Sequence, residues 1–218
     1  MGASNVEDRY RILGIDPGTN YMGYGVVEVR GSKVVSVVMG VIDLHRLDDP
    51  YAKLKMIFDR VGAVIDEYKP RDLACEAPFF GQNVQSMLKL GRAQGVVMAA
   101  ALSRGVDIFE YAPTRIKQSV AGSGGASKEQ LAAMVCSILS LPNDAERLDA
   151  TDGMAAALCH YFSTASALNG HYLTGRSKGL GGGRKALTRG GSTSWESFVK
   201  SNPEREVKSR RVVKKPLG

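Results

Sequence analysis

The chain has little of what marks secreted, membrane and metal-finger proteins. It holds three cysteines and one tryptophan in 218 residues, and aromatic residues make up 7% of it. The cysteines, Cys75, Cys136 and Cys159, stand far apart without metal-ligand spacing, so we expect reduced, mostly buried thiols in a cytoplasmic protein. No apolar run approaches the ~20 residues that cross a bilayer, and the first residues lack the apolar core of a secretory signal. We therefore expect no membrane partner.

Basic residues are concentrated at one end of the chain. The net charge is +7, but residues 169–218 hold 12 of the 29 basic and 3 of the 22 acidic residues, a net of +9. Residues 1–168 therefore carry a net of −2. The final segment is rich in Gly, Ser and basic residues without apolar periodicity, which is typical of disorder. We expect a folded domain over 1–168 and a tail over 169–218 that either binds a polyanion or only aids solubility.

The hydrophobic pattern predicts an α/β domain. Three short-connected strands come first, and helices then alternate with two further strands, which favours a mixed five-stranded sheet flanked by helices. The predicted strands are 11–15, 21–30, 34–44, 71–76 and 107–111, and the predicted helices are 50–68, 82–104, 127–139 and 144–166.

Four carboxylates stand among apolar residues at element ends. Asp16 ends the first strand and Glu76 the fourth, and parallel pairing of these strands would bring both to one sheet edge. Asp149 and Asp152 are three residues apart and share a helix face. Together these acids could hold Mg²⁺ or Mn²⁺, since hard cations prefer oxygen ligands. Singly, each also fits a turn, a strand end or a first helical turn.

Aromatic and basic residues stand in or beside two predicted loops. Phe79 and Phe80 come after Pro78 and fit either stacking on an unpaired base or docking into the core. Lys117 and Lys128 flank "SVAGSGGAS", whose glycines let backbone amides approach a phosphate, although a plain flexible connection fits as well. Arg115 is a further candidate for a phosphate contact.

Two other features of the helices have competing interpretations. Gly91, Gly95 and Ala99 make a smooth stripe on the helix over 82–104, which suits either packing on the sheet or a subunit interface. His160 follows Asp152 by eight residues, too far to join the acids directly, and we interpret it as structural.

Four segments in order resemble the RuvC family of Holliday junction resolvases. They are "ILGIDPGTNYMGYGVV", "CEAPFFGQNVQSMLKLGRAQGVVMAAA", "EYAPTRIKQSVAGSGGASKEQL" and "LDATDGMAAALCH". The resemblance covers roughly residues 11–166 and implies an RNase H-like fold. It further implies a homodimer that resolves four-way DNA junctions in recombination and repair by paired, symmetric, metal-dependent nicks, with two Mg²⁺ ions per site (Mn²⁺ as a substitute).

The resemblance also assigns residues. Asp16, Glu76, Asp149 and Asp152 match the metal-binding, catalytic acids of the family. Phe79 matches an aromatic residue that contacts bases near the junction centre, and Lys117 and Lys128 match residues near the substrate phosphates. The basic tail has no counterpart in the family's core, and we expect it to bind DNA or a branch-migration motor of the RuvA and RuvB type.

Three other functions fit parts of the sequence. A junction-binding protein without nuclease activity would not need all four acids. An actin-like ATPase or sugar kinase shares the strand-end Asp and Gly but needs two such subdomains, for which the chain is too short. A plain RNase H-type ribonuclease shares the acids but would not explain Phe79 or a two-fold dimer.

Overall fold

A computed structural model describes residues 9–77, 83–142 and 148–168. The chain divides into two units, Met1–Leu173 and Thr174–Gly218, and every described residue lies in the first. Phe79, Phe80 and the predicted tail over 169–218 lie outside the described residues. No helix in the described ranges is long and apolar enough to cross a membrane.

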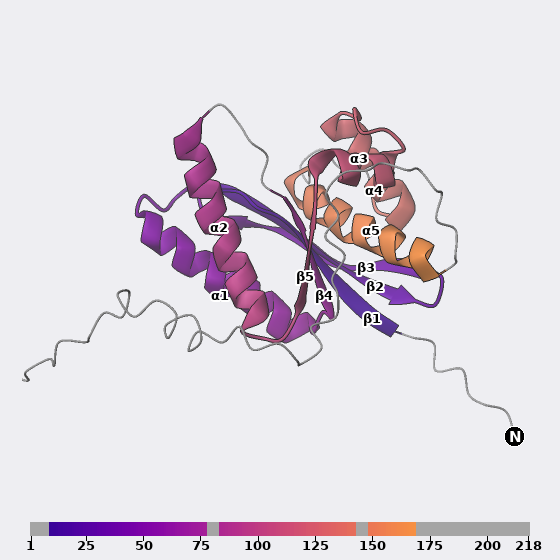
Figure 1. The fold of residues 1–218 in the computed structure, drawn as a ribbon, viewed down its shortest axis with the longest axis horizontal. Helices are drawn as coiled ribbons and strands as arrows, with labels where there is room; N and C mark the ends of the chain where they lie inside the picture. The colour runs from indigo at the N-terminus through magenta and orange to yellow at the C-terminus, as the bar shows by residue number, and fades with distance from the viewer. Residues whose placement is uncertain (1–8, 78–82, 143–147, 169–218) are drawn as a thin grey trace, which may run out of the picture. The chain divides into compact units, whose positions relative to one another are not determined.

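Five strands form one mixed sheet, as the sequence pattern predicts, and their order in the sheet is β3-β2-β1-β4-β5 (Figure 1). β1, β2 and β3 pair antiparallel, whereas β4 and β5 join β1 in parallel. The elements are β1 (Arg9–Asp16), β2 (Tyr21–Arg30), β3 (Lys33–Asp43), α1 (Pro50–Tyr68), β4 (Asp72–Glu76), α2 (Val84–Leu102), β5 (Asp107–Tyr111), α3 (Pro113–Ala121), α4 (Lys128–Leu139) and α5 (Leu148–Leu168).

Helices cover both faces of the sheet (Figure 1). Leu13 and Ile15 of β1 face α1 and α2, and Ile12 faces the side of α3, α4 and α5. A strand covered on both faces needs apolar side chains in both directions, which explains the continuous apolar run that leads to Asp16.

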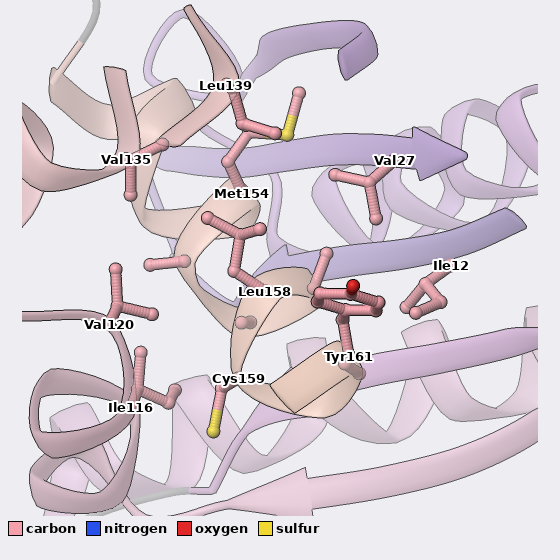
Figure 2. Packing of buried hydrophobic residues seen from close by; sticks show 14 of the residues in the cluster. Ile12, Val27, Ile116, Val120, Val135, Leu139, Met154, Leu158, Cys159 and Tyr161 are labelled. Carbon is pink, nitrogen blue, oxygen red and sulfur yellow. The ribbon is translucent and has the colours of Figure 1, made fainter. Parts of the chain in front are cut away.

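α5 is the central helix of its layer, because it lies between the sheet and two other helices. Its residues from Gly153 to Tyr161 are all buried, as expected for a helix with neighbours on every side. Figure 2 shows its side chains between those of the sheet and those of α3 and α4; the labelled ones are Met154, Leu158, Cys159 and Tyr161 of α5, Ile12 and Val27 of the sheet, and Ile116, Val120, Val135 and Leu139 of α3 and α4.

Two glycines let α5 come unusually close to the sheet. A Cβ atom added to Gly14 would lie 2.0 Å from the carbonyl oxygen of Gly153, and one added to Gly153 would lie 2.7 Å from the Cα atom of Tyr24. Both obstacles are backbone atoms, which cannot rotate away. The chain therefore needs glycine at both places, and the close contact fixes the start of α5, with its acids, over β1 and β2.

The structure adds α3, which the hydrophobic pattern did not predict. Residues Pro113–Ala121 form it, with Pro113 in the first turn and Gly122 at φ 76° as the C-terminal cap. Thr114, Ile116 and Val120 are β-branched and lower helix propensity, so the helical signal is weak. Proline at the start and glycine after the end were the available signal. Lys117, beside the glycine-rich segment, therefore lies on this helix.

Candidate active site

Asp16 and Glu76 are neighbours at one edge of the sheet. β1 and β4 pair in parallel with Ile15 opposite Cys75, so the next residue of each strand is an acid. Both side chains are half-buried. Burial raises the pKa of the Glu76 carboxyl, the negative charge of Asp152 raises it further, and the positive charge of Lys117 partly offsets both effects. Glu76 is thus a carboxylate that a nearby cation would stabilise.

The other two predicted acids come from the start of α5. Asp149 lies in its first turn, where the backbone is described but the side chain is not. Asp152 lies one turn later with 17% of its side chain exposed, and the Lys128 Nζ atom lies 2.9 Å from its Oδ2 atom. Because the charge of Asp152 acts on Glu76, the structure places this helix acid near one of the strand acids.

Two lysines enter the site from α3 and α4. The positive charge of Lys117 lowers the pKa of Glu76, and Lys128 forms an ion pair with Asp152. A capping box fixes the start of α4: the Ser127 hydroxyl accepts from the Gln130 backbone N–H at 3.2 Å, and the Gln130 side chain accepts from the Ser127 N–H at 2.9 Å. Lys128, the first helical residue, is thereby directed toward α5.

Arg115 is placed differently from the two lysines. It is exposed on α3, and among the described groups its charge acts on Cys159 and Tyr111. The structure therefore does not bring Arg115 into contact with the described acids.

Gln94 supports the site from behind, a role that the sequence did not reveal. Its side chain comes from the sheet-facing side of α2 and is 3% exposed. The Nε2 atom donates to Glu110 Oε1 at 2.9 Å, and the main-chain oxygen of Glu76 lies 3.4 Å away. These contacts hold the end of β4, from which Glu76 projects. The available signal was an amide between Ala93 and Val97 on an otherwise apolar helix face.

His160 is a structural residue, as its distance from the acids predicts. It is 1% exposed, its Nε2 atom lies 3.1 Å from Asp72 Oδ2, and its Nδ1 atom lies 2.7 Å from the Tyr111 hydroxyl. Each ring nitrogen of His160 therefore has a polar partner within the fold. The three cysteines are free and buried, also as predicted.

The donor set suits a divalent cation. Among the described residues no three His, Cys, Asp or Glu side chains are grouped as a ready metal site, and the Asp149 side chain is not among them. The carboxylates that do meet offer oxygen atoms only, the preferred ligands of Mg²⁺ and Mn²⁺. The raised pKa of Glu76 and the ammonium of Lys128 on Asp152 both indicate acids that require positive charge.

A mixed sheet of this order with carboxylates at the ends of β1 and β4 defines the RNase H-like class. Residues 12–160 match the sequence profile of the family described as "Crossover junction endodeoxyribonuclease RuvC". The chain belongs to the RuvC family of crossover junction endodeoxyribonucleases.

Individual relatives are similar in sequence over most of the chain. The protein is 49% identical to the RuvC of Cytophaga hutchinsonii, over 89% of this chain and 86% of that one. It is 50% identical to the RuvC of Porphyromonas gingivalis, over 89% of this chain and 95% of that one. The structure of Thermus thermophilus RuvC in complex with a Holliday junction substrate is similar with a TM-score of 0.66 and 33% identity, over 72% and 96% of the two chains.

Proposed function

We propose that Asp16, Glu76, Asp149 and Asp152 form the metal-dependent catalytic centre of a Holliday junction resolvase that acts in homologous recombination and repair. The enzyme nicks two symmetry-related strands of a four-way DNA junction. The observation that carries the proposal is the pairing of Asp16 and Glu76 at one sheet edge, under the charge of Asp152 on α5.

The four acids would hold two Mg²⁺ ions, or Mn²⁺ in their place. Bound there, such ions would activate a water molecule and would neutralise charge on the leaving oxygen. The half-buried position of Asp16 and Glu76 at rigid strand ends holds the ligands in place. In-line attack of water on phosphorus breaks the bond to the 3′ oxygen, which leaves a 5′-phosphate and a 3′-hydroxyl.

The lysines bind the phosphates that flank the cut. Lys128 is 43% exposed and now neutralises Asp152, so a cation bound by Asp152 would free its ammonium for a phosphate oxygen. Lys117 approaches from α3. Phe79 contacts bases at the junction centre, and Arg115, exposed on α3, contacts phosphate farther from the acids.

The enzyme acts as a homodimer through α2. Gly91 and Gly95 face open space, since a Cβ atom added to either meets nothing within 4 Å. Packing of this stripe on the sheet is therefore wrong, and the face also carries exposed Val84, Leu88 and Leu102. An apolar face with small residues lets a second helix approach, and an isologous dimer presents two equal sites to a two-fold substrate. Gly95→Glu should yield monomers in sedimentation.

The charge of the tail indicates further partners, and the free thiols indicate the compartment. Residues 169–218, with net charge +9, bind DNA or a RuvA and RuvB type branch-migration motor. Deleting them should weaken junction binding at moderate salt, and an unchanged affinity and salt slope would remove this assignment. Three buried free cysteines fit the reducing cytoplasm.

The decisive experiment compares the wild type with Asp16→Asn on a synthetic four-way junction with Mg²⁺. Linear duplex and RNA–DNA hybrid serve as controls. We expect paired nicks in the junction, lost in the variant while binding persists. Binding without cutting by the wild type would favour a junction-binding protein, and cleavage of the hybrid without junction preference would favour a ribonuclease.

A further inference from the structure

A groove with basic side chains opens between α1 and α2, which lie side by side on one face of the sheet (Figure 1). Its volume is about 630 Å³. Thr19 and Asn20 form part of its wall, only three and four residues after Asp16, and the rest comes from the first halves of α1 and α2 and from Leu44 and Asp48 in the connection before α1. The groove therefore starts at the same sheet edge as the acids, on the face away from Lys117 and Lys128.

The lining of this α1–α2 groove combines apolar side chains with basic ones. Leu54 and Ile57 lie on the floor, and Lys53, Lys89 and Arg92 are the basic lining residues. Asp48 is the single carboxylate among the described lining residues. The wall thus has a surplus of positive charge, in a domain whose residues 1–168 are slightly acidic overall.

The three cations have different tasks. The Lys53 ammonium donates to the Thr19 carbonyl and to Asn20 Oδ1, both at 3.0 Å, and so fixes the turn that follows Asp16. Lys89 and Arg92 are exposed on α2, and no described carboxylate forms an ion pair with either. Their charges are available to an anionic ligand. Tyr51, 75% exposed, presents a ring at the same groove.

We propose that the α1–α2 groove is a second DNA-binding site, which holds a strand of the junction through phosphate contacts to Lys89 and Arg92. Tyr51 packs its ring on the sugar or base of the same strand. The inference rests on the proposed action on junction DNA and extends it: the acids then lie between two basic flanks. A four-armed substrate needs such contacts on both sides, whereas a short duplex reaches one.

Charge complementarity favours DNA over a second copy of the chain as the occupant. The exposed apolar stripe of α2, with Leu88 and Gly95, offers the apolar surface that a subunit contact requires, and Arg92 lies at its border on the side of the groove. The groove instead offers unpaired cations beside the proposed catalytic edge, which suit a phosphate backbone.

The test is junction binding by the full-length double variant Lys89→Gln/Arg92→Gln, measured without metal over a range of salt concentrations. The control is Lys33→Gln/Arg60→Gln, which removes two exposed charges outside the groove. We expect the groove variant to bind the four-way junction about tenfold more weakly, with a salt slope shallower by about two. Linear duplex binding should change less, and the control should stay near the wild type.

Each other result has a defined meaning. Equal junction affinity and salt slope in the groove variant and the wild type would overturn the second site while leaving the resolvase assignment intact. Failure of the wild type itself to bind the junction would overturn the proposed function. A groove variant that turns monomeric in sedimentation would identify the groove as a subunit contact and also overturn the inference. Tyr51→Ala should weaken junction binding several-fold with no change in salt slope.

Discussion

Buried or half-buried carboxylates occur at both ends of the sheet, but the pKa values of Glu28 and Asp72 at one end and of Glu76 at the other shift in opposite directions. At the end remote from Asp16, Glu28 is 4% exposed and accepts from Arg11 at 3.0 Å and Arg30 at 2.6 Å. The hydrogen bond from Arg30 lowers the pKa of Glu28, and Arg11 adds to this against the effect of burial. Asp72, equally buried, lies between Arg71 and His160.

At the opposite end, the effects that raise the pKa of a carboxyl outweigh those that lower it. The pKa of Glu76 is raised by burial and by Asp152, and Lys117 offsets this only in part. Burial would also raise the pKa of Asp72, but hydrogen bonds from His160 and Arg71 outweigh it and lower the pKa. Carboxylates therefore stabilise the fold at one end, whereas at the other end the charge of Glu76 is disfavoured in the absence of a further cation. A buried acid indicates a metal site only where its protein partners leave it short of positive charge.

The largest expected effect separates the two ends by activity. Glu76→Gln should lower junction nicking at least a thousandfold, about 4 kcal/mol in the barrier, because a proposed metal ligand is lost. Its free energy of unfolding without metal should not fall, since a disfavoured charge is removed. Rates of nicking and urea unfolding curves measure both. If Glu76→Gln retained nicking or lost much of its stability, the contrast between the two ends of the sheet would be wrong.

Much of this contrast could be predicted from the sequence. The five strands and the position of Asp16 and Glu76 at strand ends follow from the hydrophobic patterns along the chain, whereas the order of the strands in the sheet comes from the structure. The partners of the acids could not be predicted, because Lys128 reaches Asp152 only through the α4 start and the fit of Gly14 against Gly153. The role of Gln94 could not be predicted either, because a single amide on an apolar helix face forms no periodic sequence pattern. Side-chain partners of this kind arise from packing between distant segments.

The next effect concerns the stabilising end. Asp72→Asn should cost about 2 kcal/mol of unfolding free energy, because His160 and Arg71 lose the carboxylate between them and one partner is buried. Nicking per folded molecule should remain close to the wild type at a temperature where the variant is folded. A variant with normal stability and lost nicking would show that Asp72 serves the chemistry instead.

A smaller effect on nicking is expected at Gln94, which contacts the end of β4 beneath Glu76. Gln94→Ala should lower nicking about tenfold and raise the Mg²⁺ concentration for half-maximal activity, because the end of β4 loses the amide that bonds Glu110 and approaches the Glu76 carbonyl. Gln85→Ala, an exposed glutamine on the same helix, is the matched control. If Gln94→Ala lowers stability while the Mg²⁺ requirement stays unchanged, Gln94 supports only the fold.

The smallest effect is a difference in pH dependence between the two ends. Lowered pKa values make Glu28 and Asp72 stabilising above their unfolded pKa values of about 4, and this contribution is lost as the pH falls through their folded values. Glu76 has the opposite sign: with a raised folded pKa, the folded state binds its proton more readily, so its penalty shrinks as the pH falls toward 4.5. In urea unfolding without metal, Glu76→Gln should therefore exceed the wild type in stability at neutral pH, and the gap should narrow on acidification. A constant gap would mean that Glu76 is already neutralised within the protein, and the contrast between the two ends would fail.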